Sequence, residues 1–214
     1  MKFEGFPEQA LVFYEGLEAD NSRPYWTDHK AVYESCCRAP MEALLAELQP
    51  EFGAGKLFRP YRDVRFSKNK ELYKTAIGAT TENGGYVQLS AGGLMTAGGY
   101  YHTASDQVQR MRRAVDDEVQ GPELERIVAA LRRSGYQVTG EQLRTMPRGY
   151  PGDHPRADLL RYKSMIAWRD WGQQPWLHTR QALAKVRSSW RAIRPLQVWL
   201  DTNVGPSDQP ARSR

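Results

Sequence analysis

Residues 59–74 read RPYRDVRFSKNKELYK, and this stretch marks where the chain changes from helical to strand-like spacing. Upstream, apolar side chains recur every three or four residues, whereas from Lys56 onward alternate residues share a character. In an extended strand, one face would carry Phe58, Pro60, Arg62, Val64 and Phe66, and the other would carry Arg59, Tyr61, Asp63, Arg65 and Ser67. A helical front followed by strands predicts an α+β fold.

The front third of the chain is predicted to be helical. Pro7 can begin a first helix, in which apolar residues recur at helical spacing over residues 10–17. A second helix is expected after Pro24, and a third is expected to begin at Pro40 and to end near Pro50.

A central, mostly antiparallel sheet is predicted to follow these helices. Residues 86–89 and 94–101 have strand spacing, and the glycine turn at residues 90–93 between them favours a hairpin. The Gly98-Gly99 pair predicts a bulge or a close approach of another segment to the backbone. Residues 163–171 are predicted to form a further strand.

Flanking and C-terminal helices complete the predicted fold. Two amphipathic helices are expected over residues 106–119 and 122–133, and a last helix over residues 179–193. Because 214 residues can bury one sizeable core, we predict a single α+β domain over residues 1–204. Residues 205–214 are predicted to form a disordered tail.

The composition of the chain indicates where the protein is located and which metal or redox sites it can contain. No stretch approaches the roughly 18 apolar residues that a membrane span requires, and residues 1–6 lack the layout of a secretion signal, so a cytoplasmic location without membrane contact is predicted. Cys36 and Cys37 are adjacent, which excludes the spaced ligands of a zinc site; we expect small buried hydrophobes, with a vicinal redox pair as the alternative. No cofactor and no metal site are predicted.

The net charge of +5 is unevenly distributed along the chain. Residues 1–55 carry 4 basic against 10 acidic side chains, whereas residues 56–74 carry 7 against 2 and residues 140–214 carry 13 against 6. Two basic concentrations of this kind favour an acidic ligand. The alternatives are that the acidic helices pack against the basic elements, or that each face is solvated on its own.

The first basic concentration contains a candidate site. Arg62 is surrounded by apolar residues on its face of the strand, so its guanidinium requires a carboxylate, a carbonyl or a bound anion. Arg59 and Arg65 flank Asp63, where both would address that carboxylate or one shared ligand. The candidate ligand-binding residues here are Arg59, Arg62, Arg65, Lys70 and Tyr73, with Asp63 as a candidate catalytic residue. The alternative is an internal Arg–Asp network that fixes strand register.

The second basic concentration contains the loop PRGYPGDHPR, residues 147–156. Pro155 suits the first turn of a helix, and free amides at a helix N-terminus between Arg148 and Arg156 would attract an anion. His154 is a candidate acid and base, or a helix cap. The alternative is a rigid surface corner whose Asp153 or His154 caps the helix.

Both motifs resemble those of a known family. The run Arg59-x-x-Arg62-Asp63-x-Arg65-Phe66, followed by Asn69-Lys70 and Tyr73, resembles the hallmark of the domain of unknown function 2461, a bacterial family of conserved hypothetical proteins. The similarity extends from Phe6 to about Gly205 and includes Asn21, Trp26, Gly98-Gly99-Tyr100-Tyr101 and Pro147-Arg148-Gly149-Tyr150-Pro151. Gly152-Asp153-His154-Pro155-Arg156 is similar to the actinobacterial branch, whereas Leu72 replaces a frequent proline and Asn69 a frequent aspartate. The resemblance implies no agreed function.

Three classes of function follow from these features. The first is a domain that binds a small phosphorylated or carboxylated ligand through an arginine-rich site gathered from both basic segments, with catalysis left open. The second is nucleic-acid binding, favoured by a pI of 9.2 and by tryptophans among arginines in the C-terminal third. The third is a protein-interaction scaffold. Nucleophile elbows, P-loops, zinc-protease helices and dinucleotide-binding glycine fingerprints are absent from the sequence.

Overall fold

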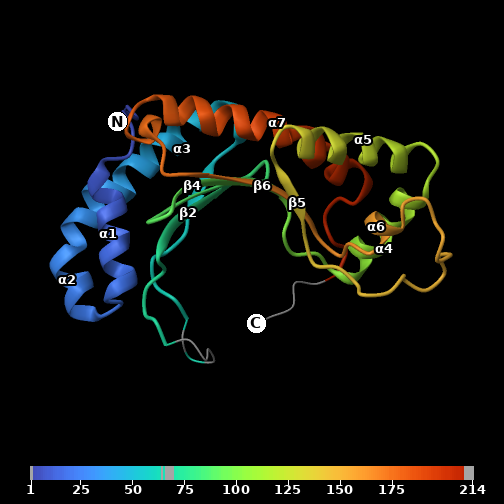
Figure 1. The fold of residues 1–214 in the computed structure, drawn as a ribbon, viewed down its shortest axis with the longest axis horizontal. Helices are drawn as coiled ribbons and strands as arrows, with labels where there is room; N and C mark the ends of the chain where they lie inside the picture. The colour runs from blue at the N-terminus through green and yellow to red at the C-terminus, as the bar shows by residue number, and fades with distance from the viewer. Residues whose placement is uncertain (1, 64, 66–69, 210–214) are drawn as a thin grey trace. The chain divides into compact units, whose positions relative to one another are not determined.

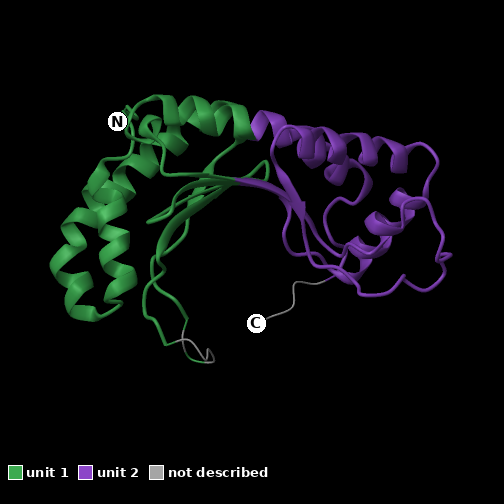
Figure 2. Cartoon of the chain, viewed as in Figure 1, with its two compact units in different colours: residues 1–96, 170–189 green, residues 97–169, 190–214 purple. Residues whose placement is uncertain are grey.

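The computed structural model describes residues 2–63, 65 and 70–209 (Figure 1). The chain has the predicted α+β fold, with helices before the sheet. It divides into two compact units, each built from two separate stretches of sequence (Figure 2). Unit 1 comprises Met1–Thr96 and Asp170–Ser189, and unit 2 comprises Ala97–Arg169 and Trp190–Arg214. The single domain over residues 1–204 stays a prediction.

The helices are α1 (Glu8–Ala19), α2 (Arg23–Val32), the π-helix η1 (Tyr33–Arg38), α3 (Ala39–Phe52), α4 (Ser105–Asp116), α5 (Gln120–Arg133), α6 (Ala157–Leu160), the 3-10 helix η2 (Pro175–His178) and α7 (Gln181–Asn203). The strands are β1 (Gly55–Leu57), β2 (Ala76–Thr81), β3 (Gly85–Ser90), β4 (Gly93–Tyr100), β5 (Gln137–Thr139) and β6 (Met165–Gly172). Their order in the sheet is β1-β2-β3-β4-β6-β5. The pairs β1/β2, β2/β3 and β5/β6 are antiparallel.

The helical front of unit 1 differs from the prediction in one respect. The helices α2 and α3 are joined through η1 into one uninterrupted run, where the sequence predicts two separate helices. Pro40 has no N–H and crowds the carbonyl four residues before it, so the helix widens ahead of this residue. Ala39 accordingly donates its N–H to Glu34 O, five residues back. Pro50 lies inside α3, which ends at Gly53 with a φ of 78°.

The strand predicted from Lys56 onward is divided in the structure. Only Gly55–Leu57 lies in the sheet, paired with β2, a strand that the sequence pattern does not predict. Beyond β1 the chain continues to Tyr61, which forms an isolated antiparallel bridge with Tyr73. The predicted strand residues 64, 66 and 67 lie outside the described residues.

Two other predicted features of the sheet are confirmed. The strands β3 and β4 form at the predicted glycine hairpin, and β6 forms at the strand predicted for residues 163–171. The glycine pair in β4 is explained at Gly99, where φ is +121° and an added Cβ would lie 2.4 Å from Met165 O in β6. The predicted close approach is therefore real, and only glycine permits it.

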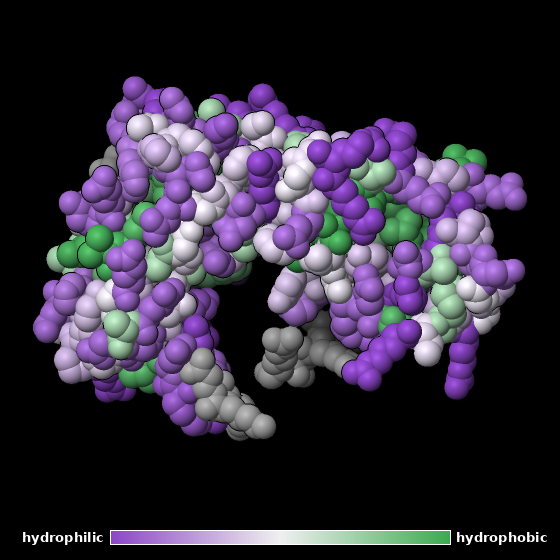
Figure 3. All heavy atoms as spheres, viewed as in Figure 1, coloured by the Kyte–Doolittle hydropathy of each residue, from purple (hydrophilic) through white to green (hydrophobic). Residues whose placement is uncertain are grey.

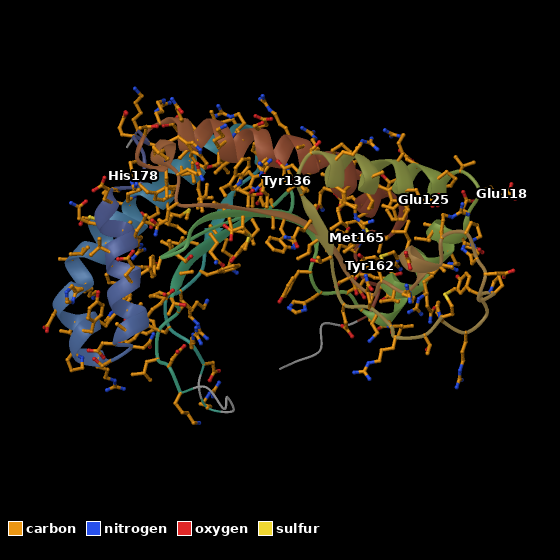
Figure 4. The ribbon with its side chains drawn as sticks, in the orientation of Figure 1. Glu118, Glu125, Tyr136, Tyr162, Met165 and His178 are labelled. Atoms are coloured by element: carbon orange, nitrogen blue, oxygen red, sulfur yellow. The ribbon has the colours of Figure 1, made fainter. Side chains whose placement is uncertain are left out.

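The core of unit 2 lies between β5 and β6 and the helices α4 to α7. The predicted helices over residues 106–119 and 122–133 are confirmed as α4 and α5. Met165 and Tyr162, labelled in Figure 4, are both buried in this core. The Tyr162 hydroxyl donates to Val138 O at 3.2 Å, so even the polar end of this ring is paired inside the unit.

The C-terminal helix continues past its predicted end at residue 193 to Asn203, with Pro195 inside it. After α7, residues 204–209, here called the C-terminal segment, are bound to α4. Arg110 donates to Val204 O at 2.6 Å and to Asp208 Oδ2 at 2.9 Å. Asp106 accepts hydrogen bonds from the Ser207 hydroxyl and from the Asp208 backbone N–H. The disorder of residues 205–214 stays a prediction, and residues 210–214 lie outside the described residues.

The face of the molecule drawn in Figure 3 is mainly hydrophilic. Hydrophilic residues cover most of the face that Figure 3 shows, with hydrophobic residues visible in smaller groups. Within the part of the chain that the structure describes, no helix combines the length and the apolar character that a membrane crossing requires.

Candidate functional site

The basic stretch forms a hairpin-like part of unit 1, here called the arm and defined as residues 58–63 and 70–74. Arg62 donates its N–H to Leu72 O at 2.9 Å, and Lys74 donates its N–H to Pro60 O at 2.7 Å. Side-chain exposure alternates along residues 58–63, where even-numbered residues are half-buried and odd-numbered residues are exposed. The two predicted faces are therefore confirmed over these six positions.

Asn21 fixes the arm to the helical front. Its side-chain oxygen accepts the Tyr73 N–H at 2.9 Å, and its side-chain nitrogen donates to Tyr73 O at 3.1 Å. The Tyr73 ring stacks on Trp26 with a centroid distance of 4.5 Å and an interplanar angle of 8°. Tyr61 packs against both rings from the exposed side. Because Tyr73 is only 5% exposed, its role seen here is to anchor the arm.

Arg62 finds a carboxylate within the arm. Its Nη1 lies 2.9 Å from Glu71 Oε2, which is the kind of partner that its apolar surroundings predict. Both side chains are partly exposed, so the pair stabilises the fold by only about 0–1 kcal/mol. One carboxylate engages only part of a guanidinium that has five N–H donors, and Arg62 can still address a ligand.

Asp63 and Arg65 form a second, exposed pair. Arg65 Nη2 donates to Asp63 Oδ2 at 2.7 Å and Arg65 Nε donates to Asp63 Oδ1 at 3.0 Å. These side-chain bonds, followed by one from the Arg65 backbone N–H, lower the Asp63 pKa from 3.8 to about 2. Asp63 is therefore ionised at neutral pH and is a weak base. Its catalytic assignment stays a prediction.

Arg59 and Lys74 add two further cations to the arm. The Lys74 pKa lies below its ordinary value because burial disfavours the ammonium, and because Arg59 and Arg62 repel it. Among residues 2–63, 65 and 70–209, no carboxylate lies within 4.0 Å of a side-chain nitrogen of Arg59 or Lys74. The arm thus concentrates positive charge that its own carboxylates do not neutralise.

A pocket of about 310 Å³ opens on the half-buried face of the arm, between it and β2 and β3. Its lining residues are Phe58, Arg62, Lys74, Thr75, Ala76, Gly78, Tyr86 and Gln88. Two of the three mutually repelling cations, Arg62 and Lys74, therefore face the same hollow. Lys74, Phe58 and Tyr86 are not among the sequence-predicted site residues. The alternation of faces along the strand places Phe58 on the same face as Arg62, so Phe58 could have been predicted. The position of Lys74 opposite Pro60 depends on how the hairpin pairs its two segments, which the alternation does not show. Lys70 is exposed and does not line the pocket.

In unit 2, His154 is held from both sides. The Arg156 backbone N–H donates to His154 Nδ1 at 3.0 Å, and His154 Nε2 lies 3.1 Å from Asp116 Oδ1. Because a backbone N–H can only donate, Nδ1 accepts, and this assigns the ring proton to Nε2, aimed at Asp116. His154 thus joins the loop to the end of α4. Its role as an acid and base stays a prediction.

The Arg156 guanidinium binds the C-terminal end of α4. Its Nε donates to Val115 O at 2.6 Å, and its Nη2 donates to Asp116 O at 3.0 Å and to Asp117 O at 3.4 Å. The Val115 and Asp116 carbonyls have no partners inside the helix, whereas Asp117 O also accepts the Gly121 N–H at 3.1 Å. A cation at this end is favoured by the helix dipole. An added Cβ at Gly121 would lie 2.4 Å from Arg156 Nε, so glycine leaves the space that this side chain occupies.

Most of the remaining loop residues are exposed, except buried Pro147 and half-buried Tyr150. Arg148 and Asp153 lie on the surface of unit 2, and α6 begins two residues after Pro155 rather than at it. The two basic segments belong to different units. The arm forms a pocket with β2 and β3 of its own unit, and a pocket built from both basic segments stays a prediction.

Other candidate chemistry is limited. Burial raises the Cys37 pKa to about 12, so this thiol is a buried hydrophobe, as predicted. Trp190 and Trp199 are buried, and the other tryptophans of the C-terminal third are half-buried. Across the described residues, no three His, Cys, Asp or Glu side chains are grouped so that they could hold a metal ion.

The family model for the conserved hypothetical proteins DUF2461 matches residues 9–199. The chain belongs to this family. The match spans the arm, the helical front and most of unit 2. Searches of curated proteins and of solved structures found no match. Three of the positions on which the resemblance to DUF2461 rests, Asn21, Trp26 and Tyr73, meet in the structure as the anchor of the arm.

Proposed function

We propose that this protein binds a small anionic ligand, phosphorylated or carboxylated, in the pocket between the arm and strands β2 and β3. The observation that carries the proposal is the grouping of Arg59, Arg62 and Lys74, of which two line a pocket of about 310 Å³. Their mutual repulsion disfavours the empty state, and a bound anion would relieve it. A cytoplasmic location is part of the proposal.

The ligand would be held as follows. Arg62 presents a planar fork suited to a carboxylate or a phosphate, while Lys74 adds a point charge from the neighbouring segment. Arg59 lies on the exposed face and strengthens the field without lining the pocket. Of the other predicted site residues, Asp63 pairs with Arg65, which follows the first segment of the arm, so we assign these two to shaping the arm rather than to contacting the ligand.

Isothermal titration calorimetry with inorganic phosphate, pyrophosphate and acetate tests the proposal. Replacing Lys74 or Arg62 with glutamine should weaken the binding of the best anion by about tenfold or more, the effect of losing one charge-assisted hydrogen bond. Arg144→Gln is the matched control, because Arg144 is an exposed arginine of unit 2. Absence of binding for all three anions, or an equal loss in the control, would overturn the proposal.

The salt dependence of binding distinguishes the proposed anion pocket from the nucleic-acid alternative. A single-stranded oligonucleotide bound through its phosphates should lose affinity steeply as the salt concentration rises, whereas binding in an enclosed pocket should weaken less. Tight, salt-sensitive binding of the oligonucleotide without binding of small anions would favour that alternative.

A further inference from the structure

We infer that the anion bound by the arm carries a planar aromatic ring next to its charged group. This inference rests on the proposed function, because it takes Arg62 and Lys74 as the residues that bind the anion. It is based on the walls and the floor of the same pocket, which the charge argument does not use.

The floor of the pocket includes Gly78, on which the Tyr86 ring packs. Gly78 in β2 pairs with Gln88 in β3. Both lie on the face of the sheet opposite to that of the buried residues Ile77 and Val87. A Cβ at position 78 would lie 2.9 Å from the Tyr86 hydroxyl oxygen. Glycine therefore leaves the space that the Tyr86 ring occupies, and its φ does not require glycine for any other reason.

Two aromatic rings form the walls. The centroids of Phe58 and Tyr86 lie 6.2 Å apart, with the ring planes tilted by 34°. Phe58 is held by its backbone N–H, which donates to Gly78 O at 2.9 Å, and Tyr86 is oriented by its hydroxyl, which donates to Gln88 Oε1 at 2.7 Å. Aromatic rings attract further rings in offset or tilted arrangements at centroid distances of about 4.5–7 Å. A planar ring that enters the pocket can therefore pack against the Phe58 ring.

The charge lies beside the rings. Lys74 Nζ is 5.2 Å from the centroid of the Phe58 ring, and Arg62 lines the same pocket. An anion paired with Lys74 is thus held close to the Phe58 ring. A ligand whose anionic group is attached directly to an aromatic ring meets both requirements at once. The pocket volume of about 310 Å³ favours a small aryl anion over a polymer.

Matched ligand pairs test this inference on the full chain by calorimetry. Phenyl phosphate is compared with inorganic phosphate, and benzoate is compared with cyclohexanecarboxylate, which is apolar but not planar. We expect the aryl member of each pair to bind about tenfold more tightly. Phe58→Leu should remove most of this preference and keep the affinity for inorganic phosphate. Gly78→Ala should weaken both aryl ligands, because the added methyl group would push the Tyr86 ring out of its place. Thermal unfolding of each variant verifies that it is folded.

The outcomes are distinct. An aryl preference that is lost in a folded Phe58→Leu variant supports the inference. Equal binding of phenyl phosphate and phosphate, or an aryl preference unchanged by both substitutions, overturns it and leaves the proposed function intact. Failure of every anion to bind overturns the proposed function and this inference together. A nucleoside monophosphate, in which a ribose separates the phosphate from the base, distinguishes a nucleotide from a simple aryl acid as the source of the chemistry.

Discussion

Replacing Asn21 with alanine removes both hydrogen bonds between this side chain and the backbone of Tyr73. Tyr73 is 5% exposed, so its N–H and C=O would be left with little access to water. An unsatisfied buried polar group costs about 1–3 kcal/mol, and two such groups suggest a loss of about 2–6 kcal/mol in the free energy of unfolding. For a protein of this size, that loss corresponds to a fall in Tm of about 4–24 °C.

Urea and thermal denaturation followed by circular dichroism measure this loss. Asn83→Ala is the control, because Asn83 is exposed in the turn between β2 and β3. Asn21→Asp keeps the acceptor for the Tyr73 N–H and loses the donor, so its stability should lie between wild type and Asn21→Ala. If Asn21→Ala is destabilised no more than Asn83→Ala, the anchoring role of Asn21 is refuted.

Three further predictions concern other parts of the molecule. Arg156→Met should lower the free energy of unfolding by about 2–3 kcal/mol, because three carbonyls at the end of α4 lose a charged donor; a loss below about 0.5 kcal/mol in urea denaturation would contradict this. The pKa of Asp63 is lowered in the folded state, so its stabilising effect is present above about pH 4 and lost as the pH falls toward 2. Carbon-13 NMR should show that titration near pH 2, and Arg65→Ala should return it toward 3.8. Iodoacetamide at pH 8 should modify half-buried Cys36 and leave Cys37 unmodified in the native protein, and equal rates at the two thiols would argue against the burial of Cys37.

The fold class could be predicted because hydrophobic spacing is a local property. The change from helical to strand spacing near Lys56 and the glycine hairpin both appear in the structure. The strand β2 was missed because its sequence, AIGATT, has no clear alternation, and its pairing with β3 provides the missing information. The end of α7 was missed because Pro195 suggests a helix end, although it removes only one hydrogen bond. Buried Leu196, Trp199 and Leu200 continue the apolar face and hold the helix together beyond it.

The candidate site could be predicted only in part, for a related reason. The alternation of faces indicated that Arg62 needs a partner, but the choice of Glu71 depends on how the arm turns back. Lys74 joins Arg62 only through the hairpin register, and Phe58 meets Tyr86 only through the pairing of three segments. Contacts of this kind depend on tertiary structure, so no local pattern predicts them.

The C-terminal segment has a practical consequence for anyone who shortens the chain. The sequence suggests residue 204 as a natural place to stop, yet Arg110 and Asp106 on α4 take their partners from residues 204–208. In a protein cut there, Arg110 and Asp106 would still lie 3.2 Å from each other, but Arg110 would lose its contact with Asp208, and Asp106 would lose its hydrogen bonds from Ser207 and Asp208. The truncation itself would then alter the solubility, the crystal contacts and the apparent ionic-strength dependence of binding. Experiments on ligand binding should therefore retain at least residues 2–209.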